Sequence, residues 1–273
     1  MRYIFYLFQF LVNSNIFVSL CVLCLYHSSQ LLLNSYNLNL SCFVFFSTLF
    51  IYNFHRLVRV NKDISKKKKV WIMKNTNFLY SLCFLSLFIC FYCFYQFNLN
   101  TKLLVLITSV FSLLYPYYLR KIPYTKIIQI SITWTTTTVL LLTLENNIII
   151  DVNIILLLIG RFFFVFSITI PFDIRDMTFD KIELKTIPII FGQKKSKIIA
   201  LNSIIIFALI CYTQFLYSYI TIPELLSILI CCFIIFLFII NSDLDKKEFY
   251  FSFWVESSSI MIYLFLLFSK LIF

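Results

Sequence analysis

The sequence predicts an all-α, polytopic membrane protein with about nine transmembrane helices. Of its 273 residues, 61% are apolar and only 13% are charged, whereas a soluble domain is roughly half apolar and a quarter charged. The apolar residues form successive runs of the length that a helix needs to cross a bilayer, about 20 residues. Lys and Arg gather in the short segments between these runs, which is typical of cytoplasmic loops.

The apolar runs set the order of the expected helices. The first run has a single charge before it, Arg2, and lacks a cleavage motif of small residues, so we expect a retained helix rather than a signal peptide. No linker or low-complexity tract interrupts the series, and we expect one domain over residues 1–273. The helices are expected near residues 3–26, 38–55, 76–97, 102–119, 124–145, 148–172, 197–219, 222–241 and 249–272.

The distribution of basic residues predicts the orientation. With a cytoplasmic N terminus and nine spans, all but three of the 23 Lys and Arg residues lie on the inner side. The exceptions are Lys102 and Lys270 outside and Arg161 within a span. This asymmetry follows the positive-inside rule. We therefore expect a multi-pass protein with the N terminus in the cytoplasm and the C terminus outside, in the inner or plasma membrane if the source is a bacterium.

Composition also excludes several classes of protein. The net charge of +11 indicates contact with anionic lipid rather than nucleic acid, because the basic residues flank apolar spans. With only 2 glycines, the chain has no glycine-rich phosphate loop. The 9 cysteines all fall inside apolar runs, where they are expected to pack as small apolar side chains.

Three aspartates at the inner end of the sixth span form the most informative cluster. Asp173, Asp176 and Asp180 have the spacing i, i+3, i+7, which places them within about 60° of one helical face. Such carboxylates repel one another and need a compensating cation. Arg175, Lys181 and Lys185 could supply it as a solvated patch, or Mg²⁺ could bind there, since Mg²⁺ prefers carboxylate and phosphate oxygens. The spacing alone leaves both possibilities open.

These residues resemble the second aspartate-rich motif of the UbiA superfamily of intramembrane prenyltransferases. The motif continues into Lys185, Thr186, Pro188 and Gly192, and residues 114–124 are similar to the inner loop after the family's fourth helix. The resemblance implies a bundle of nine helices around a central cavity. It also implies transfer of an isoprenoid from its diphosphate to an aromatic or other lipophilic acceptor. In that case Asp173, Asp176 and Asp180 would hold catalytic Mg²⁺, and Lys181 and Lys185 would help to neutralise the diphosphate.

The first aspartate-rich motif of the family is lost in this chain. Asn53 matches it, but Phe54 and Leu57 stand at the positions of its first two aspartates. In one interpretation, Arg side chains replace a metal ion at the diphosphate, because a guanidinium binds phosphate in bidentate fashion. The opposite wall of the site would then consist of Asn53, His55, Arg56 and Arg59.

Other interpretations of the lost motif remain open. These basic residues could be ordinary inner-face charges, in which case the protein would be a non-catalytic lipid-binding or scaffold relative. A transporter is a further alternative, but the sequence shows no internal repeat. No protein partner can be predicted.

Two polar features lie within the spans. Arg161 is an intramembrane charge, which normally faces protein or a watery cavity, and it could instead pair with Glu256 in the last span. The run Thr135 to Thr138 is expected to hydrogen-bond mainly to its own backbone or to a neighbouring helix.

Overall fold

The computed structural model describes residues 2–60, 66–177 and 185–272, without the side chains of residues 2–5, 66, 67 and 121. Every regular element in these ranges is helical, and eight of the helices are long and apolar enough to span a membrane. A ninth apolar helix, Leu99–Leu114, is shorter. The all-α membrane fold is thus confirmed, with nine as an approximate number of spans. The elements are α1 (Arg2–Asn13), α2 (Ile16–Leu33), α3 (Leu38–Val58), α4 (Lys66–Lys74), α5 (Thr76–Gln96), α6 (Leu99–Leu114), η1 (Leu119–Lys121), α7 (Thr125–Thr135), η2 (Thr136–Leu140), α8 (Leu141–Glu145), α9 (Val152–Asp176), α10 (Ile187–Leu216), α11 (Ile222–Ile240), η4 (Tyr250–Val255) and α12 (Ser258–Ile272).

The first span differs from its prediction. Instead of one helix over residues 3–26, the chain forms α1 and α2, which are separated at Ser14 and Asn15. Asn15 adopts the left-handed conformation, with φ 60°, and Asn tolerates this region better than most residues. Asn13, Ser14 and Asn15 interrupt the apolar run at this point, and the prediction of a single helix did not take this polar interruption into account.

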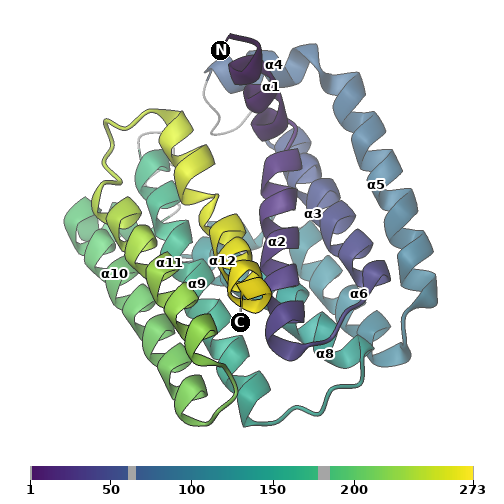
Figure 1. Ribbon diagram of the computed structural model, residues 1–273. Helices are drawn as coiled ribbons and strands as arrows, with labels where there is room; N and C mark the ends of the chain where they lie inside the picture. The colour runs from purple at the N-terminus through teal and green to yellow at the C-terminus, as the bar shows by residue number, and fades with distance from the viewer. Residues whose placement is uncertain (1, 61–65, 178–184, 273) are drawn as a thin grey trace.

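The long helices form one bundle, with α2 and α12 between the group of α9, α10 and α11 and the group of α3, α5 and α6 (Figure 1). α2 packs against α3 and α12, α3 packs against α5, and α6 contacts α8. On the other side, α9 packs between α7 and α10, and α10, α11 and α12 follow in sequence order back to α2. α2, α9 and the α7–α8 segment are the most buried spans, whereas α5 is the most exposed.

Two glycines shape the pair formed by α9 and α10. A Cβ atom at Gly160 of α9 would lie 3.3 Å from Ile210 Cγ2 of α10, so glycine allows the two helices to approach closely. Gly192 interrupts α10 with φ 75°, a conformation that suits glycine.

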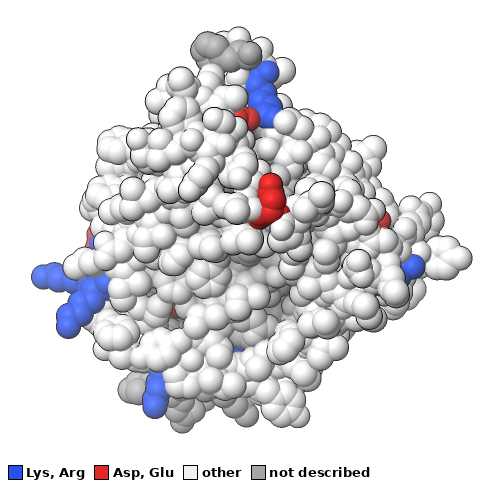
Figure 2. All heavy atoms as spheres, turned by 90° about the horizontal axis from the view of Figure 1, so that it is seen from below, with Lys and Arg blue, Asp and Glu red and all other residues white. Residues whose placement is uncertain are grey.

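Charged side chains are unevenly distributed between the two ends of the bundle. The end at the bottom of Figure 1 carries few of them, and the basic ones in view lie mostly near its rim (Figure 2). At the opposite end, the last turns of α3 and α9 and the first turn of α7 bring basic residues around one cavity. The cytoplasmic assignment of this basic end stays a prediction.

Candidate functional site

A cavity of about 600 Å³ lies at the basic end of the bundle. Its lining includes seven Lys and Arg side chains but only two acidic ones, Asp176 and Glu248, which gives a net charge of +5 with neutral His55. A wall of this kind favours an anionic ligand, because converging cations in a partly desolvated cavity strengthen one another's field. We call it the basic cavity. Its basic lining is His55, Arg56 and Arg59 of α3, Lys68 of α4, Arg120 of η1, Lys126 of α7, Arg175 of α9 and Lys246 before η4.

One wall of the basic cavity is the last turn of α9. Asp173 is almost completely buried, and its Oδ1 lies 2.6 Å from the Lys126 Nζ. The same ammonium lies 3.6 Å from Oδ2 of Asp176. Arg175 also donates to Asp176, from Nε to Oδ1 at 2.7 Å and from Nη2 to Oδ2 at 3.2 Å. Both aspartates are therefore compensated by cations of the chain itself.

The opposite wall is the last turn of α3, where Arg56 and Arg59 line the basic cavity. His55 Nε2 lies 2.7 Å from the carbonyl oxygen of Ser112 on α6. Since a carbonyl only accepts, this ring nitrogen donates, and the contact ties α3 to α6. Asn53 is fully buried; its amide nitrogen donates to the carbonyl of Ser14, and its oxygen accepts from Asn15. It thereby joins α3 to the break between α1 and α2 and is not part of the cavity lining.

The rim of the basic cavity is held by an ion pair between Lys68 of α4 and Glu248, which precedes η4. Burial lowers the pKa of Lys68 below its ordinary value. Burial would raise the pKa of Glu248, but the neighbouring Lys68 ammonium holds that pKa below its ordinary value. Glu248 is therefore ionised at neutral pH and anchors α4 over the cavity.

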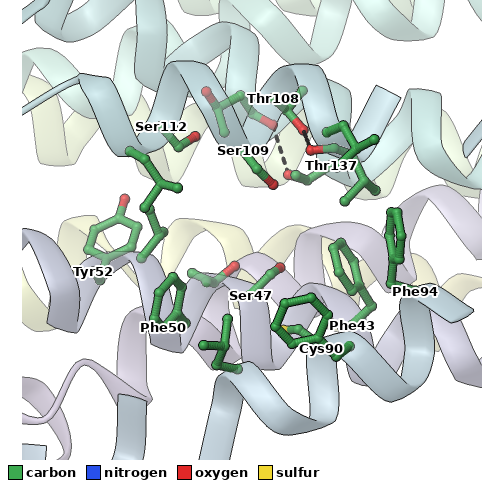
Figure 3. Close-up of a pocket in the computed structure, with 18 of the residues that line it drawn as sticks. Phe43, Ser47, Phe50, Tyr52, Cys90, Phe94, Thr108, Ser109, Ser112 and Thr137 are labelled. Atoms are coloured by element: carbon green, nitrogen blue, oxygen red, sulfur yellow. Dashed lines mark hydrogen bonds between the residues drawn. The ribbon is translucent and has the colours of Figure 1, made fainter. Parts of the chain in front are cut away.

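An apolar cavity of about 290 Å³ lies deeper in the bundle, between α3, α5, α6 and the α7–η2 segment. Phe43, Phe50 and Phe94 point into it, and Ser109 faces them from α6 (Figure 3). Four hydroxyl groups in the wall donate to carbonyls of their own helices, those of Ser47, Thr48, Thr108 and Thr137. The wall therefore presents mainly carbon to a ligand.

The two cavities are adjacent. They share five lining residues, Ile51, Tyr52, Ser112, Thr133 and Trp134. The indole N–H of Trp134 donates to the Tyr52 hydroxyl at 3.2 Å, which fixes this junction. Together the cavities offer a cationic end and an apolar end to one elongated ligand.

Comparison with known proteins identifies the fold and the family. A sequence model of the UbiA prenyltransferase family matches residues 74–257. This chain belongs to that family. No curated protein sequence matches the chain significantly.

Solved structures of UbiA homologues share the whole fold at low sequence identity. A homologue from Archaeoglobus fulgidus, bound to GPP and Mg²⁺, matches with a TM-score of 0.69 and 16% identity over 97% of this chain and 99% of that one. The apo structure of a homologue from Aeropyrum pernix K1 matches with a TM-score of 0.73 and 12% sequence identity. The match covers 94% of this chain and 98% of that one. A digeranylgeranylglyceryl phosphate synthase matches with a TM-score of 0.63 and 16% sequence identity. The match covers 96% of this chain and 98% of that one.

The family match begins at residue 74, after the α3 wall. That wall is where this UbiA member lacks the first aspartate motif: Phe54 and Leu57 stand in place of acids. The α9 wall, which carries the second motif, lies within the matched range. The two walls therefore differ in how closely they follow the family.

The described residues do not fit the magnesium site that the resemblance implies. Within the described ranges, no group of three or more His, Cys, Asp or Glu side chains could hold a metal ion. Both oxygens of Asp176 already accept from Arg175, and Asp173 is paired with Lys126. A divalent cation would have to displace these partners in a cavity of net positive charge. Asp180 lies outside the described residues.

Of the two lysines predicted beside the aspartates, Lys181 lies outside the described residues. Lys185 is exposed, with φ 41°, two residues before α10. It is not among the side chains that line the basic cavity.

Sequence reasoning counted Lys126 only as an inner-face charge and did not assign Arg120, Lys68 or Lys246 to the site. One signal could have pointed to Lys126. It lies in the first turn of α7, where the helix dipole disfavours a cation. A lysine there needs a nearby acid, and the aspartates of α9 provide it.

Arg161 does not pair with Glu256. Its Nη2 donates to the hydroxyls of Ser28 at 2.8 Å and Ser29 at 2.9 Å, both on α2. Glu256 instead interacts electrostatically with Arg175, Lys68 and Arg56. Arg161 thus joins α9 to α2 inside the bundle, away from the basic cavity.

Proposed function

We propose that this chain is a prenyltransferase that moves an isoprenoid from its diphosphate to an aromatic or other lipophilic acceptor within the membrane. One observation carries the proposal: the basic cavity and the apolar cavity lie next to each other and share five lining residues. A prenyl diphosphate has the same division, with a highly anionic head and an apolar chain. Family membership supports the reaction class.

The chemistry needs stabilisation of a leaving group. When the allylic C1–O bond breaks, its electron pair leaves on the diphosphate, and C1 forms a new bond to the acceptor, which loses a proton. Arg56, Arg59, Lys126 and Arg175 line the cavity where the diphosphate would lie. Fixed cations that face a developing negative charge lower the barrier, and the apolar wall keeps water from the electron-deficient carbon.

The aspartates of α9 and the other predicted site residues have supporting roles in this proposal. Asp173 and Asp176 hold Lys126 and Arg175 in position. Asp180 and Lys181 enter through the resemblance alone. Asn53 positions the α3 wall, and Lys185, like Asp180 and Lys181, enters through the resemblance alone. Magnesium enters only through the relatives, since A. fulgidus structures hold GPP or DMAPP together with Mg²⁺.

A binding series tests the proposed function. Purified protein in nanodiscs, with Mg²⁺ present, is titrated with geranyl diphosphate, geraniol and inorganic diphosphate. We expect geranyl diphosphate to bind most tightly, because it alone occupies both cavities. Incubation with membrane lipid extracts should then release diphosphate and yield prenylated lipid by mass spectrometry. Equal affinity for geraniol and geranyl diphosphate would refute the proposal, and tight binding without turnover would favour a non-catalytic lipid-binding relative.

A further inference from the structure

Lys126 occupies the position that a bridging cation would take between the aspartates of α9. Its Nζ lies 2.6 Å from Asp173 Oδ1 and 3.6 Å from Asp176 Oδ2. Asp173 is only 1% exposed, and Lys126 itself is largely shielded. Desolvated ion pairs of this kind resist separation, because removing one partner leaves an uncompensated buried charge.

The surroundings of Lys126 strengthen the case that no divalent ion is needed. Arg175 holds both oxygens of Asp176. Across the cavity, the α3 wall offers Arg56 and Arg59 in place of carboxylates. The described lining therefore carries its own positive charge on both walls, and this charge repels a divalent cation.

We infer that Lys126 is a resident cation that replaces a metal ion at this site, so that the diphosphate binds to Lys126 and the arginines without a divalent metal. The inference rests on the proposed function for the identity of the ligand. It goes further by assigning a role to a lysine from outside both aspartate motifs. It also predicts that removal of the Lys126 side chain makes diphosphate binding depend on a divalent metal.

The test measures geranyl diphosphate binding in nanodiscs, once with EDTA and once with Mg²⁺. Wild-type protein should bind equally well in both. Lys126→Ala should bind at least about tenfold more weakly in EDTA, as expected for loss of a charge-assisted contact. Mg²⁺ should restore this binding, because the aspartate pair is then accessible to a metal. As a second readout without ligand, Mn²⁺ titration followed by EPR should show tighter binding by Lys126→Ala than by wild type.

Three further variants control for folding and for general charge effects. Lys126→Arg keeps the charge and should bind without metal. Lys126→Met combined with Asp173→Asn leaves no unpaired charge at this contact; it should bind weakly and show no rescue by Mg²⁺. Lys197→Ala removes a lysine that pairs with Asp243 at 2.7 Å outside the basic cavity lining, and it should behave like wild type.

The outcomes separate this inference from the proposed function. Wild-type binding that requires Mg²⁺ would overturn the role of Lys126 and leave the prenyltransferase proposal intact. So would undiminished binding by Lys126→Ala in EDTA. Absence of binding under both conditions, in protein that is folded and monodisperse, would overturn both.

Discussion

At the scale of single residues, the two acids that line the basic cavity each have a basic partner. Asp176 is paired with Arg175 and Lys126, and Glu248 is paired with Lys68. Asp173 and Glu256 add acidic groups next to the cavity, and the lining itself still carries a net positive charge. An anionic ligand is the natural partner, and this makes the arginines of α3 the most informative residues to change.

We predict that Arg56→Ala weakens geranyl diphosphate binding by about ten- to a hundredfold. Arg56 lines the basic cavity, and a buried hydrogen bond to a charged group contributes about 1.5–3 kcal/mol. Isothermal titration calorimetry at fixed ionic strength would measure the change. The matched control is Lys195→Ala, because Lys195 is exposed on α10 and its charge is screened by salt.

Equal affinity in wild type, Arg56→Ala and Lys195→Ala would contradict a role for Arg56 at the diphosphate. In that case the α3 cations would serve membrane topology alone. The double variant Phe54→Asp, Leu57→Asp gives a second test of the same role. Its new acids should pair with Arg56 or Arg59 and weaken the binding of geranyl diphosphate.

The sequence could predict part of this site and not the rest. The aspartates and the α3 wall were visible as local patterns, as was the need for a compensating cation. Arg175 is one such cation, and it is adjacent in sequence to Asp176. Lys126 lies on another helix, so its pairing depends on how α7 packs against α9, which spacing along the chain does not encode.

At the scale of elements, the spans were predictable and the cavities between them were not. A bilayer requires continuous apolar helices, so hydropathy found every long helix. It could not distinguish the apolar cavity from lipid-facing surface, because both are built from the same residue types. The break at Asn15 was missed although Asn13, Ser14 and Asn15 are all polar; its contact with the amide of Asn53 could not be predicted.

We predict that Ser109→Phe weakens binding of the isoprenoid chain and leaves binding of the diphosphate group unchanged. Ser109 projects from α6 into the apolar cavity (Figure 3), so a phenyl ring there fills space that the isoprenoid needs. Each buried methylene contributes about 0.8 kcal/mol, and exclusion of two or three should weaken geranyl diphosphate binding roughly tenfold or more. Affinity for inorganic diphosphate should not change.

The matched control for this prediction is Ser81→Phe. Ser81 is exposed on α5 and is not in the lining of either cavity. If Ser109→Phe bound geranyl diphosphate as well as Ser81→Phe, the apolar cavity would not be the chain site. A parallel loss for inorganic diphosphate would instead indicate a general disturbance of the fold.

At the scale of the whole molecule, the position of the basic cavity at one end of the bundle connects topology with function. The basic cavity lies at one end of the bundle, and the apolar cavity adjoins it and shares five of its lining residues. The side of the membrane that this end faces therefore decides which pool of diphosphate the protein can use. Inner-face retention of Lys and Arg predicts the cytoplasm.

We predict that the end opposite the basic cavity is the outer face, and cysteine labelling of intact cells can test this. In a cysteine-depleted background, Ile149→Cys should react with a membrane-impermeant maleimide added outside. Ile149 is 83% exposed between α8 and α9, at the end with few charges. Lys247→Cys, which is exposed beside the basic cavity, should react only after the cells are opened. Both sites are accessible in the folded protein, so a difference between them reports the membrane barrier rather than burial. The reverse pattern would place the basic cavity outside, because the bundle carries the whole site on one end. It would also remove the cytoplasmic diphosphate pool from the proposed reaction.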